Sequence, residues 1–392
     1  MKTQVGIVGA GPAGLLLSHL LHLDGIESVV IEAKSRQYVE DRIRAGVLEQ
    51  GSVDLVTAAG VGERMRREGL VHEGIYLLFQ RRRHRIDFKD LTGGRCVTVY
   101  GQQEVVKDLI EARVNAGGQL VFGAEQVSIT GFENGPAVIR YRGERGEQQV
   151  HCDFIAGCDG FHGICRPSIP DGALRVYERV YPFAWLGILA QAPPASEELI
   201  YANHDRGFAL LSMRSPTVTR LYLQCAPDEE LSLWPDGRIW EELQLRLSSD
   251  SDFRLVEGPI LQKSVTPMRS FVAEPMQFGR LFLAGDSAHI VPPTGAKGMN
   301  LAIADVRMLS RAMKAFYSSG DAEPLANYSN NCLRRVWRAQ QFSYWMTTLL
   351  HKFDGSPSAF DHKRQLGELD NVTSSRAAAM NLAENYTGLP ID

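Results

Sequence analysis

The chain has 392 residues, of which 44% are hydrophobic, and a formal net charge of -4 from 46 acidic and 42 basic residues. This length allows two or three domains, and the near balance of charge gives no reason to expect nucleic acid or an anionic membrane as a partner. The six cysteines form no C-x-x-C pair and suit no zinc site, so no metal is assigned. No run of 18 apolar residues predicts a membrane span, and reduced thiols favour a cytoplasmic protein.

The first thirty residues predict a β-α-β unit. Apolar Val5–Val8 precedes leucines at helical spacing, and Val29–Ile31 resembles a second buried strand. Between the first strand and the helix stands Gly9-Ala10-Gly11-Pro12-Ala13-Gly14. Its first glycine permits a tight turn, its second lets the backbone approach a pyrophosphate, and its third allows close packing. With Glu32 placed to bind a ribose diol, the unit predicts a site for an adenine dinucleotide, either FAD or NAD.

The sequence pattern changes twice along the rest of the chain. Two further helices are predicted over 47–59 and 103–115. Between about 181 and 267, short β-branched and aromatic runs predict a mostly antiparallel sheet, and from Lys297 onward the chain is expected to be helical. The predicted fold class is therefore α/β, with a Rossmann-like dinucleotide-binding domain, a substrate-binding β-sheet domain and a C-terminal helical region. The expected boundaries are 1–175 (completed by about 268–300), 176–290 and 291–392.

Two later motifs place carboxylates at strand ends. Cys158-Asp159-Gly160 ends one apolar run, and Gly285-Asp286 ends another. In a doubly wound sheet, ligands bind at this edge, and Asp286 can hold ribityl hydroxyls. A Gly/Pro-rich loop then leads into a helix that begins with Gly298-Met299-Asn300, and a helix N-terminus there would stabilise negative charge on a reduced flavin.

Two runs in the central region predict a hairpin. If residues 215–219 form the turn, Ser212 faces Tyr222 and Arg214 faces Arg220 on one side of the sheet. A hydroxyl, a phenol and two guanidinium groups suit a carboxylate ligand, with Arg214 as a bidentate clamp. An exposed sheet face is the alternative interpretation of the same alternation.

These motifs, in this order, resemble those of the group A flavoprotein monooxygenases, and within them the branch that hydroxylates 4-hydroxybenzoate. The resemblance runs over nearly the whole chain. Cys165 departs from the pattern, since many relatives have serine or another small residue there. The resemblance implies a GR2-type FAD-binding fold and a homodimer, with the C-terminal helices as the plausible interface. It is densest over 42–51, 157–163, 181–186, 200–210, 285–298 and 384–390.

The resemblance also implies which residues bind the two nucleotides. Those for reduced nicotinamide are Arg44, His162 and Arg269, with Lys34 and Arg36 placed to meet a 2′-phosphate. We expect NADPH with tolerance for NADH, because Ala33 stands where strictly NADPH-dependent relatives have arginine. Those for FAD are Gly9, Gly11, Pro12, Ala13, Gly14, Glu32, Arg42, Arg44, Gln102, Asp159, Arg220, Asp286, Pro293, Gly298, Met299 and Asn300.

For the substrate, the resemblance implies that Ser212, Arg214 and Tyr222 hold a carboxylate. Tyr201, Tyr386 and His72 would form a relay that drains the phenol proton. The Pro293 carbonyl would accept from the substrate hydroxyl, and Asn300 would make a polar contact near the flavin.

The implied reaction converts 4-hydroxybenzoate into 3,4-dihydroxybenzoate with reduced nicotinamide and O2, through a flavin C4a-hydroperoxide. Alternatives are a hydroxylase of another aromatic acid, such as 3-hydroxybenzoate or salicylate, and a flavin-binding redox sensor without turnover. Nicotinamide oxidation stimulated by the substrate separates a hydroxylase from a sensor.

Overall fold

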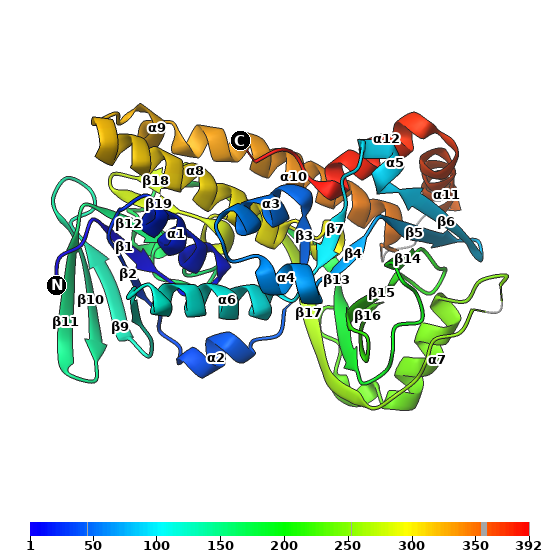
Figure 1. Cartoon of the computed structure of the whole chain (residues 1–392). Coiled ribbons are helices and arrows are strands. Elements are labelled where there is room, and N and C mark those ends of the chain that lie inside the picture. Colours follow the sequence, from blue (N-terminus) through cyan, green and yellow to red (C-terminus); the bar gives the residue numbers. More distant parts are fainter. Residues whose placement is uncertain (45, 252, 354–358, 392) are drawn as a thin grey trace.

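A computed structural model describes residues 1–44, 46–251, 253–353 and 359–391. The chain forms two lobes joined by long helices that run along one side of the molecule (Figure 1). One lobe carries the N-terminal strands and the other carries the long central strands. This division follows from the two kinds of sequence pattern, parallel strands joined by helices and antiparallel strands joined by turns.

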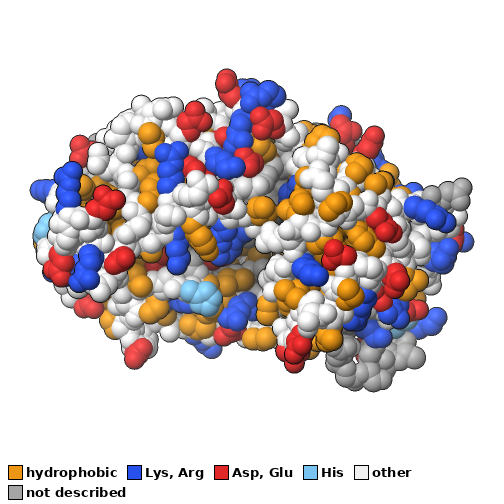
Figure 2. All heavy atoms as spheres, turned by 90° about the horizontal axis from the view of Figure 1, so that it is seen from below, with side chains coloured by type: hydrophobic (Ala, Val, Ile, Leu, Met, Phe, Trp, Pro, Cys, Tyr) orange, Lys and Arg blue, Asp and Glu red, His pale blue; other side chains and the backbone are white. Residues whose placement is uncertain are grey.

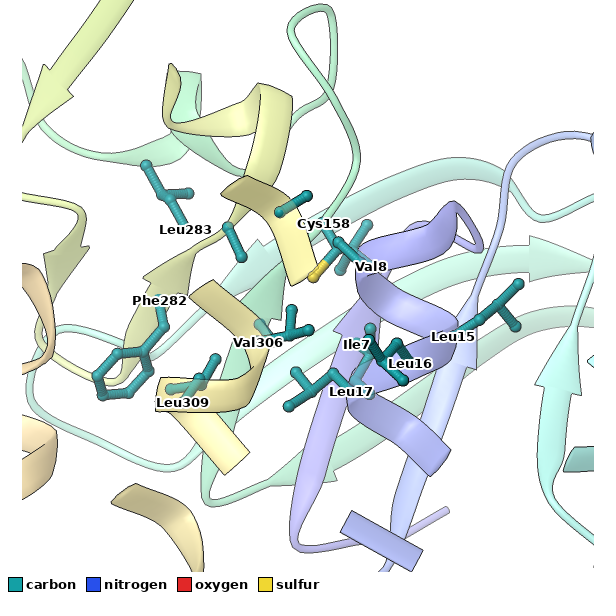
Figure 3. Packing of buried hydrophobic residues seen from close by; sticks show 14 of the residues in the cluster. Ile7, Val8, Leu15, Leu16, Leu17, Cys158, Phe282, Leu283, Val306 and Leu309 are labelled. Atoms are coloured by element: carbon teal, nitrogen blue, oxygen red, sulfur yellow. The ribbon is translucent and has the colours of Figure 1, made fainter. Parts of the chain in front are cut away.

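The first lobe is built on a six-stranded sheet with the order β18-β19-β12-β1-β2-β8. Helix α1 (Pro12–Leu23) packs on it together with α8 (Gly298–Ser319), and Figure 3 shows Leu16 and Leu17 of α1 beside Ile7 of the central strand. All pairs in this sheet are parallel except β18 with β19. The strands are β1 (Val5–Val8), β2 (Ser28–Ile31), β8 (Gln119–Val121), β12 (Phe154–Gly157), β18 (Gln277–Phe278) and β19 (Leu281–Leu283).

The register of this sheet decides where its motifs meet. Val8 pairs with Ile31 on one side and with Gly157 on the other, so three neighbouring strands end at one level. Gly9, Glu32 and Asp159 therefore lie at one carboxyl edge, as the sequence predicts. Helix α6 (Gln102–Asn115) contacts α1, and an antiparallel sheet of three strands extends the lobe: β9 (Glu125–Thr130), β10 (Ala137–Gly143) and β11 (Gly146–Cys152).

The second lobe contains an eight-stranded sheet with the order β20-β17-β13-β16-β15-β14-β5-β6. The predicted antiparallel character is confirmed for every pair except β14 with β5, which are parallel. Helix α7 (Asp236–Arg246) belongs to this lobe. The strands are β5 (Gly74–Phe79), β6 (Arg82–Asp87), β13 (Arg175–Ala190), β14 (Ile200–Ala202), β15 (Ala209–Ser215), β16 (Val218–Cys225), β17 (Ile260–Glu274) and β20 (His289–Ile290).

The sheets divide the chain differently from the expected boundary at residue 175. β5 and β6 precede that boundary, yet they complete the sheet of the second lobe. A helix was expected over 47–59, but Val47–Glu49 forms β3 and the helix α3 begins only at Gln50. Pairing with β7 holds these first residues extended, within a small sheet of β3, β7 (Val97–Val99) and β4 (Leu70–His72).

The C-terminal part is helical, as expected. Helix α10 (Tyr328–Leu350) contacts α8, and α12 (Arg376–Thr387) returns to contact α5 (Phe88–Thr92). Among the described residues, none of the helices combines the length and the hydropathy that crossing a membrane requires. The remaining helices are α2 (Arg36–Asp41), α4 (Glu63–Glu68), α9 (Glu323–Ala326) and α11 (Ala359–Ser374).

Candidate active site

The glycine motif leaves space and free donors at the start of α1. A Cβ on Gly9 would lie 2.4 Å from the Cys158 carbonyl oxygen, and one on Gly14 would lie 2.0 Å from the Gly9 oxygen. A Cβ on Gly11 would meet nothing within 4 Å, and no side chain caps the helix. The fold itself therefore requires Gly9 and Gly14, whereas the space at Gly11 and the uncapped amides suit a pyrophosphate.

The carboxylates at the sheet edge are only partly used by the protein. Glu32 accepts hydrogen bonds from the backbone N–H of Ala10 and Lys34, both at 2.8 Å. Asp159 Oδ2 accepts from Cys165 N at 2.8 Å, while its Oδ1 is buried without a partner among the described residues. Burial raises the pKa of Asp159. Since Cys165 takes part through its backbone, the unusual side chain leaves this bond intact, and the free oxygen fits a bound dinucleotide.

Two predicted FAD residues from distant parts of the chain meet beside this edge. Asp286 lies in the short helix η3 (Gly285–Ser287), and its Oδ2 is 3.6 Å from Arg44 Nη1. Burial lowers the pKa of Arg44, and Asp286 opposes this shift. Gln102 is the first residue of α6, and Gly298 and Met299 begin α8. The contacts of these residues with FAD stay predictions.

The predicted nicotinamide residues fall into two groups. The Phe161 ring contacts His162, with centroids 5.0 Å apart, and the Arg269 guanidinium, at 4.8 Å. Phe161 is thus the link between these two positions, which the sequence did not reveal. Arg269 also pairs with Glu178 at 3.3 Å. Figure 2, a view from below, shows Lys, Arg and His side chains around the waist between the lobes, which fits a face that receives an anionic nucleotide.

The second group lies near α2. Lys34 Nζ and the Arg42 guanidinium stand over the Tyr38 ring at 5.8 and 5.9 Å. Arg36 pairs instead with Glu40 at 2.7 Å within the helix. The positive charge expected to meet a 2′-phosphate is therefore partly neutralised, although exposed pairs of this kind are weak.

The register of the substrate hairpin differs from the prediction. Ser212 pairs with Arg220, and Leu210 pairs with Tyr222. The turn contains two residues instead of the expected 215–219, and the pairing shifts between Met213 and Ser215. Because side chains alternate with a period of two, this two-residue error leaves Ser212, Arg220 and Tyr222 on one face, as predicted.

This face holds two guanidinium groups that have no carboxylate partner within the part of the chain that the structure describes. Arg214 Nη1 donates to Met213 O at 2.7 Å and to Ser212 Oγ at 3.4 Å, but its Nε is buried without a partner among the described residues. Nε and Nη1 of Arg220 are also buried without a partner among the described residues. Burial lowers the pKa of Arg214, and Tyr222 opposes this shift. Since unpaired buried donors are costly, the arrangement suits a carboxylate that arrives from outside the protein.

A pair of tyrosines joins the same sheet to the C-terminal helices. The hydroxyl of Tyr201, on β14, is 2.5 Å from that of Tyr386, on α12, and both side chains are buried. Burial raises the pKa of both, so both stay neutral at physiological pH and each can accept one proton while donating another. The Phe88 ring stacks on Tyr386 with centroids 4.9 Å apart and fixes its orientation.

His72, the expected end of the relay, is buried at the end of β4. Neither ring nitrogen has a partner among the described residues. Burial lowers the pKa of His72 to about 4, so the ring is neutral at pH 7 and can accept a proton. The structure shows no direct hydrogen bond between His72 and the tyrosines, so its place in the relay stays a prediction.

Pro293 and Asn300 occupy the loop and helix start that follow. Pro293 lies in η4 (Pro293–Gly295), and its carbonyl accepts from Ala296 N at 2.9 Å. The Asn300 amide donates to Val47 O and Ala296 O and accepts from Glu49 N, all within 2.9 Å. These bonds fix β3 against α8, so the structure gives the Asn300 side chain a positioning role.

The sequence did not predict a buried ion pair that lies next to Asn300. Lys297 Nζ lies 2.6 Å from Glu49 Oε1 and also donates to the carbonyl of Tyr386 at 3.1 Å. Burial lowers the pKa of Lys297, against the effect of Glu49. The pair ties α8 to β3 and to the helix that carries Tyr386. A lysine within an otherwise apolar helix start was the available signal, but its partner is far away in sequence.

Comparisons with known proteins agree with this geometry. The FAD binding domain family matches residues 2–343. The p-hydroxybenzoate hydroxylase of Acinetobacter baylyi is 51% identical over 392 residues, which is 100% of this chain and 96% of that protein. The chain belongs to the group A flavoprotein monooxygenases. FAD is therefore its cofactor, and the free carboxylate oxygen, the uncapped helix and the space at Gly11 fit that group.

More distant relatives support the same assignment. The 6-methylpretetramide 4-monooxygenase of Streptomyces rimosus is 27% identical over 315 residues, covering 77% of this chain and 73% of that protein. The crystal structure of p-nitrophenol 4-monooxygenase from Pseudomonas putida superposes with a TM-score of 0.83 at 16% identity, covering 98% of both chains. This structural similarity confirms the α/β fold with its FAD-binding domain, β-sheets and C-terminal helices.

Proposed function

We propose that the protein hydroxylates 4-hydroxybenzoate to 3,4-dihydroxybenzoate, with O2 and reduced nicotinamide as co-substrates, NADPH before NADH. One observation carries this proposal: guanidinium groups with unpaired donors lie on the same sheet as Tyr201, whose hydroxyl contacts that of Tyr386. An aromatic acid with a carboxylate at one end and a hydroxyl at the other offers one group to the cations and one to the proton acceptor. The 51% identity to a p-hydroxybenzoate hydroxylase supports the same substrate.

The chain's own residues bind and activate the substrate. Arg214 holds the carboxylate, with Ser212 and Tyr222 as further hydrogen-bonding groups. The Pro293 carbonyl accepts from the substrate hydroxyl and orients it. Holding both ends fixes the ring in one position relative to the cofactor, which replaces a bimolecular encounter by an oriented one.

The tyrosines then move the proton. The Tyr201 hydroxyl accepts the phenol proton, Tyr386 passes it on, and neutral His72 receives it at a ring nitrogen. Loss of this proton makes the ring carbon ortho to the phenol oxygen more nucleophilic. When bound, FAD supplies the transfer of two electrons from nicotinamide and the activation of O2. Burial of both tyrosines keeps bulk water away from the reacting ring.

We extend the proposal to the nucleotide contacts and to the assembly. Arg44, His162 and Arg269, with Lys34 and Arg36, bind the reduced nicotinamide. The protein functions as a cytoplasmic homodimer that associates through its C-terminal helices. Size-exclusion chromatography of the holoenzyme with light scattering tests the assembly. A monomer mass at all concentrations would exclude the homodimer. The FAD contacts are made by Gly9, Gly11, Pro12, Ala13, Gly14, Glu32, Arg42, Arg44, Gln102, Asp159, Arg220, Asp286, Pro293, Gly298, Met299 and Asn300.

The test is oxidation of NADPH and NADH by the FAD-loaded enzyme, with and without 4-hydroxybenzoate, while products are separated by chromatography. We expect strong stimulation and one 3,4-dihydroxybenzoate per nicotinamide oxidised. Stimulation with peroxide but no hydroxylated product would mean that 4-hydroxybenzoate is only an effector, and 3-hydroxybenzoate and salicylate are then compared in the same assay. No stimulation by any phenolic acid would leave a redox sensor as the better interpretation.

A further inference from the structure

Several charged residues lie on the elements near His72, and Glu198 is the one whose charge acts on its ring. Glu73 follows it directly and pairs with Lys89 of α5 at 2.5 Å. Val97 of β7 pairs with His72 in the small sheet, which places Cys96 beside it. The other charged groups on neighbouring strands are Arg85 and Asp87 of β6 and Glu198, two residues before β14.

Strand register places Glu198 next to His72. β14 runs parallel to β5, with Ile200 opposite Tyr76, and the Tyr76 N–H donates to Leu199 O at 2.8 Å. Continued by two residues, this register sets Glu198 beside Gly74, the second residue after His72. Glu198 also lies three residues before Tyr201, so one short segment carries both the first hydroxyl of the relay and this carboxylate.

Arg85 fixes the Glu198 carboxylate in this place. Its Nε and Nη2 each lie 2.8 Å from one Glu198 oxygen, which is a bidentate pair. A Cβ on Gly74 would lie 3.2 Å from Arg85 Nη2, so the guanidinium rests directly on that strand. The side chain of Glu198 is only 12% exposed, whereas Asp87, the other partner of Arg85, is 44% exposed. Glu198 is therefore at the buried end of the cluster, and Asp87 is at the end open to solvent.

We propose that Glu198, held by Arg85, is the counter-ion of His72 and makes this histidine the acceptor at which protons leave the buried relay. The inference rests on the proposed function only in taking His72 as the end of the relay. Glu198 and Arg85 are positioning residues, because they act on the proton through His72.

The charges of Glu198 and Arg85 determine in which direction each substitution shifts the pKa of His72. Burial lowers the pKa of His72 to about 4, and Glu198 acts in the opposite direction. Without the carboxylate charge of Glu198 nothing opposes burial, so the pKa of His72 should fall further. Without Arg85 the negative charge of Glu198 is no longer neutralised, so the pKa of His72 should rise. An opposite charge nearby shifts a pKa by roughly one to three units. If Glu198 and Arg85 had merely structural roles, their substitutions would not shift the pKa of His72 in opposite directions.

The experiment titrates His72 in the FAD-loaded enzyme by NMR of labelled imidazoles between pH 4 and 8, with His72→Asn to assign the signal. In the wild type we expect half-protonation at about pH 4. In Glu198→Gln the ring should stay neutral over the whole range, and in Arg85→Gln it should titrate inside the range. Asp87→Asn is the matched control, since it removes the exposed carboxylate on the same arginine and should leave the titration unchanged.

Unchanged His72 titration in both Glu198→Gln and Arg85→Gln would overturn the proposal, and so would shifts of the same sign. The hydroxylation rate of the same variants provides the functional test: it should fall about tenfold in Glu198→Gln and stay at the wild-type value in Asp87→Asn, as expected for a shift of roughly one unit. If the wild type forms no 3,4-dihydroxybenzoate, the proposed function fails, while the NMR titration still decides the role of Glu198.

Discussion

The dinucleotide edge and the substrate sheet prepare for their ligands in opposite ways. At the edge, backbone geometry makes the site: Gly9 and Gly14 allow close approach, and amides at the start of α1 remain free. In the substrate sheet, side chains make the site, and the guanidinium donors of Arg214 and Arg220 lie buried without an anion. At the edge, the missing side chains of the glycines make room for the ligand. In the sheet, the unpaired guanidinium donors need a ligand to satisfy them.

This difference determines how each region responds to substitution. A change at the edge disturbs the fold through steric contact, because the glycines are packed against backbone. A change in the sheet mainly removes an interaction with the ligand, because several donors there, such as Arg214 Nε, have no partner among the described residues to lose. The predictions below test this contrast, beginning with the largest effect.

The largest effect is expected for Gly14→Ala. Its Cβ would lie 2.0 Å from the Gly9 oxygen, so the helix must move away from β1. We expect a loss of about 3 kcal/mol in the free energy of unfolding, the upper end for overpacking, and no retained FAD. Urea denaturation and flavin absorbance measure the two effects. Gly11→Ala is the control: the apoprotein should keep its stability and lose only FAD affinity, and equal destabilisation by both would contradict the account.

A slightly smaller but selective effect is expected for Arg214→Gln. Losing a buried charged partner costs about 2.8 kcal/mol, in the lower part of the range for such pairs, which is about a hundredfold in the Kd of 4-hydroxybenzoate. The flavin absorbance change on titration with the acid measures this Kd. Arg238→Gln, at an exposed arginine of α7 that stacks on Trp234, is the control and should bind normally. Wild-type affinity in Arg214→Gln would place the carboxylate elsewhere.

Tyr386→Phe should slow hydroxylation and leave substrate affinity intact. The ring keeps its stacking on Phe88, but the 2.5 Å bond to Tyr201 is lost. We expect product formation to fall about a hundredfold, the lower range for a lost proton-transfer group. Single-turnover product formation measures it. Tyr328→Phe removes another buried hydroxyl, bonded to Leu283 O, and should lower stability by about 1 kcal/mol without slowing hydroxylation.

Acid should weaken the substrate lobe through its buried histidines. The pKa of His72 is about 4 in the folded state, below the ordinary value of 6.5, because of burial. Between these values the unfolded state binds more protons, so this contribution to stability is complete above pH 6.5 and is lost as the pH falls toward 4. Urea denaturation at pH 7, 6 and 5 should show a slope that His72→Asn reduces by up to about 1.4 kcal/mol per pH unit.

The smallest effect concerns the nicotinamide. Glu40→Gln removes the carboxylate that pairs with Arg36 at 2.7 Å and frees this cation for a 2′-phosphate. An exposed pair contributes about 0.5 kcal/mol, so the preference for NADPH over NADH should rise about twofold. The ratio of kcat/KM for the two nucleotides measures it. Asp41→Asn, which alters only a bond to Gln37, is the matched control, and an equal change there would mean that general charge and not Arg36 is responsible.

The sequence predicted the dinucleotide edge well because its parts are close together in the chain. The glycine motif, the strand that follows it and Glu32 lie within about thirty residues, and their periodicity specifies the local structure. Asp159 and Asp286 were placed by the rule that parallel strands end at one edge. The hairpin register was wrong because periodicity fixes the face of a strand but not the length of its turn.

What the sequence could not provide was contact between distant segments. The β5–β14 pairing that brings Glu198 beside His72, and the Lys297–Glu49 pair, join residues more than a hundred positions apart. Such contacts depend on how the two lobes are threaded, and no local pattern encodes them. Phe161 was missed for the same reason, since its neighbours His162 and Arg269 meet only in the folded chain.

The central claim is that the substrate spans from the unpaired guanidinium groups to the tyrosine pair. A crystal structure of the FAD-loaded enzyme with 4-hydroxybenzoate tests it most directly. The account predicts the carboxylate within hydrogen-bonding distance of Arg214 and Ser212, and the phenol oxygen within hydrogen-bonding distance of Tyr201. A substrate bound in the reverse orientation, or away from both groups, would contradict the account.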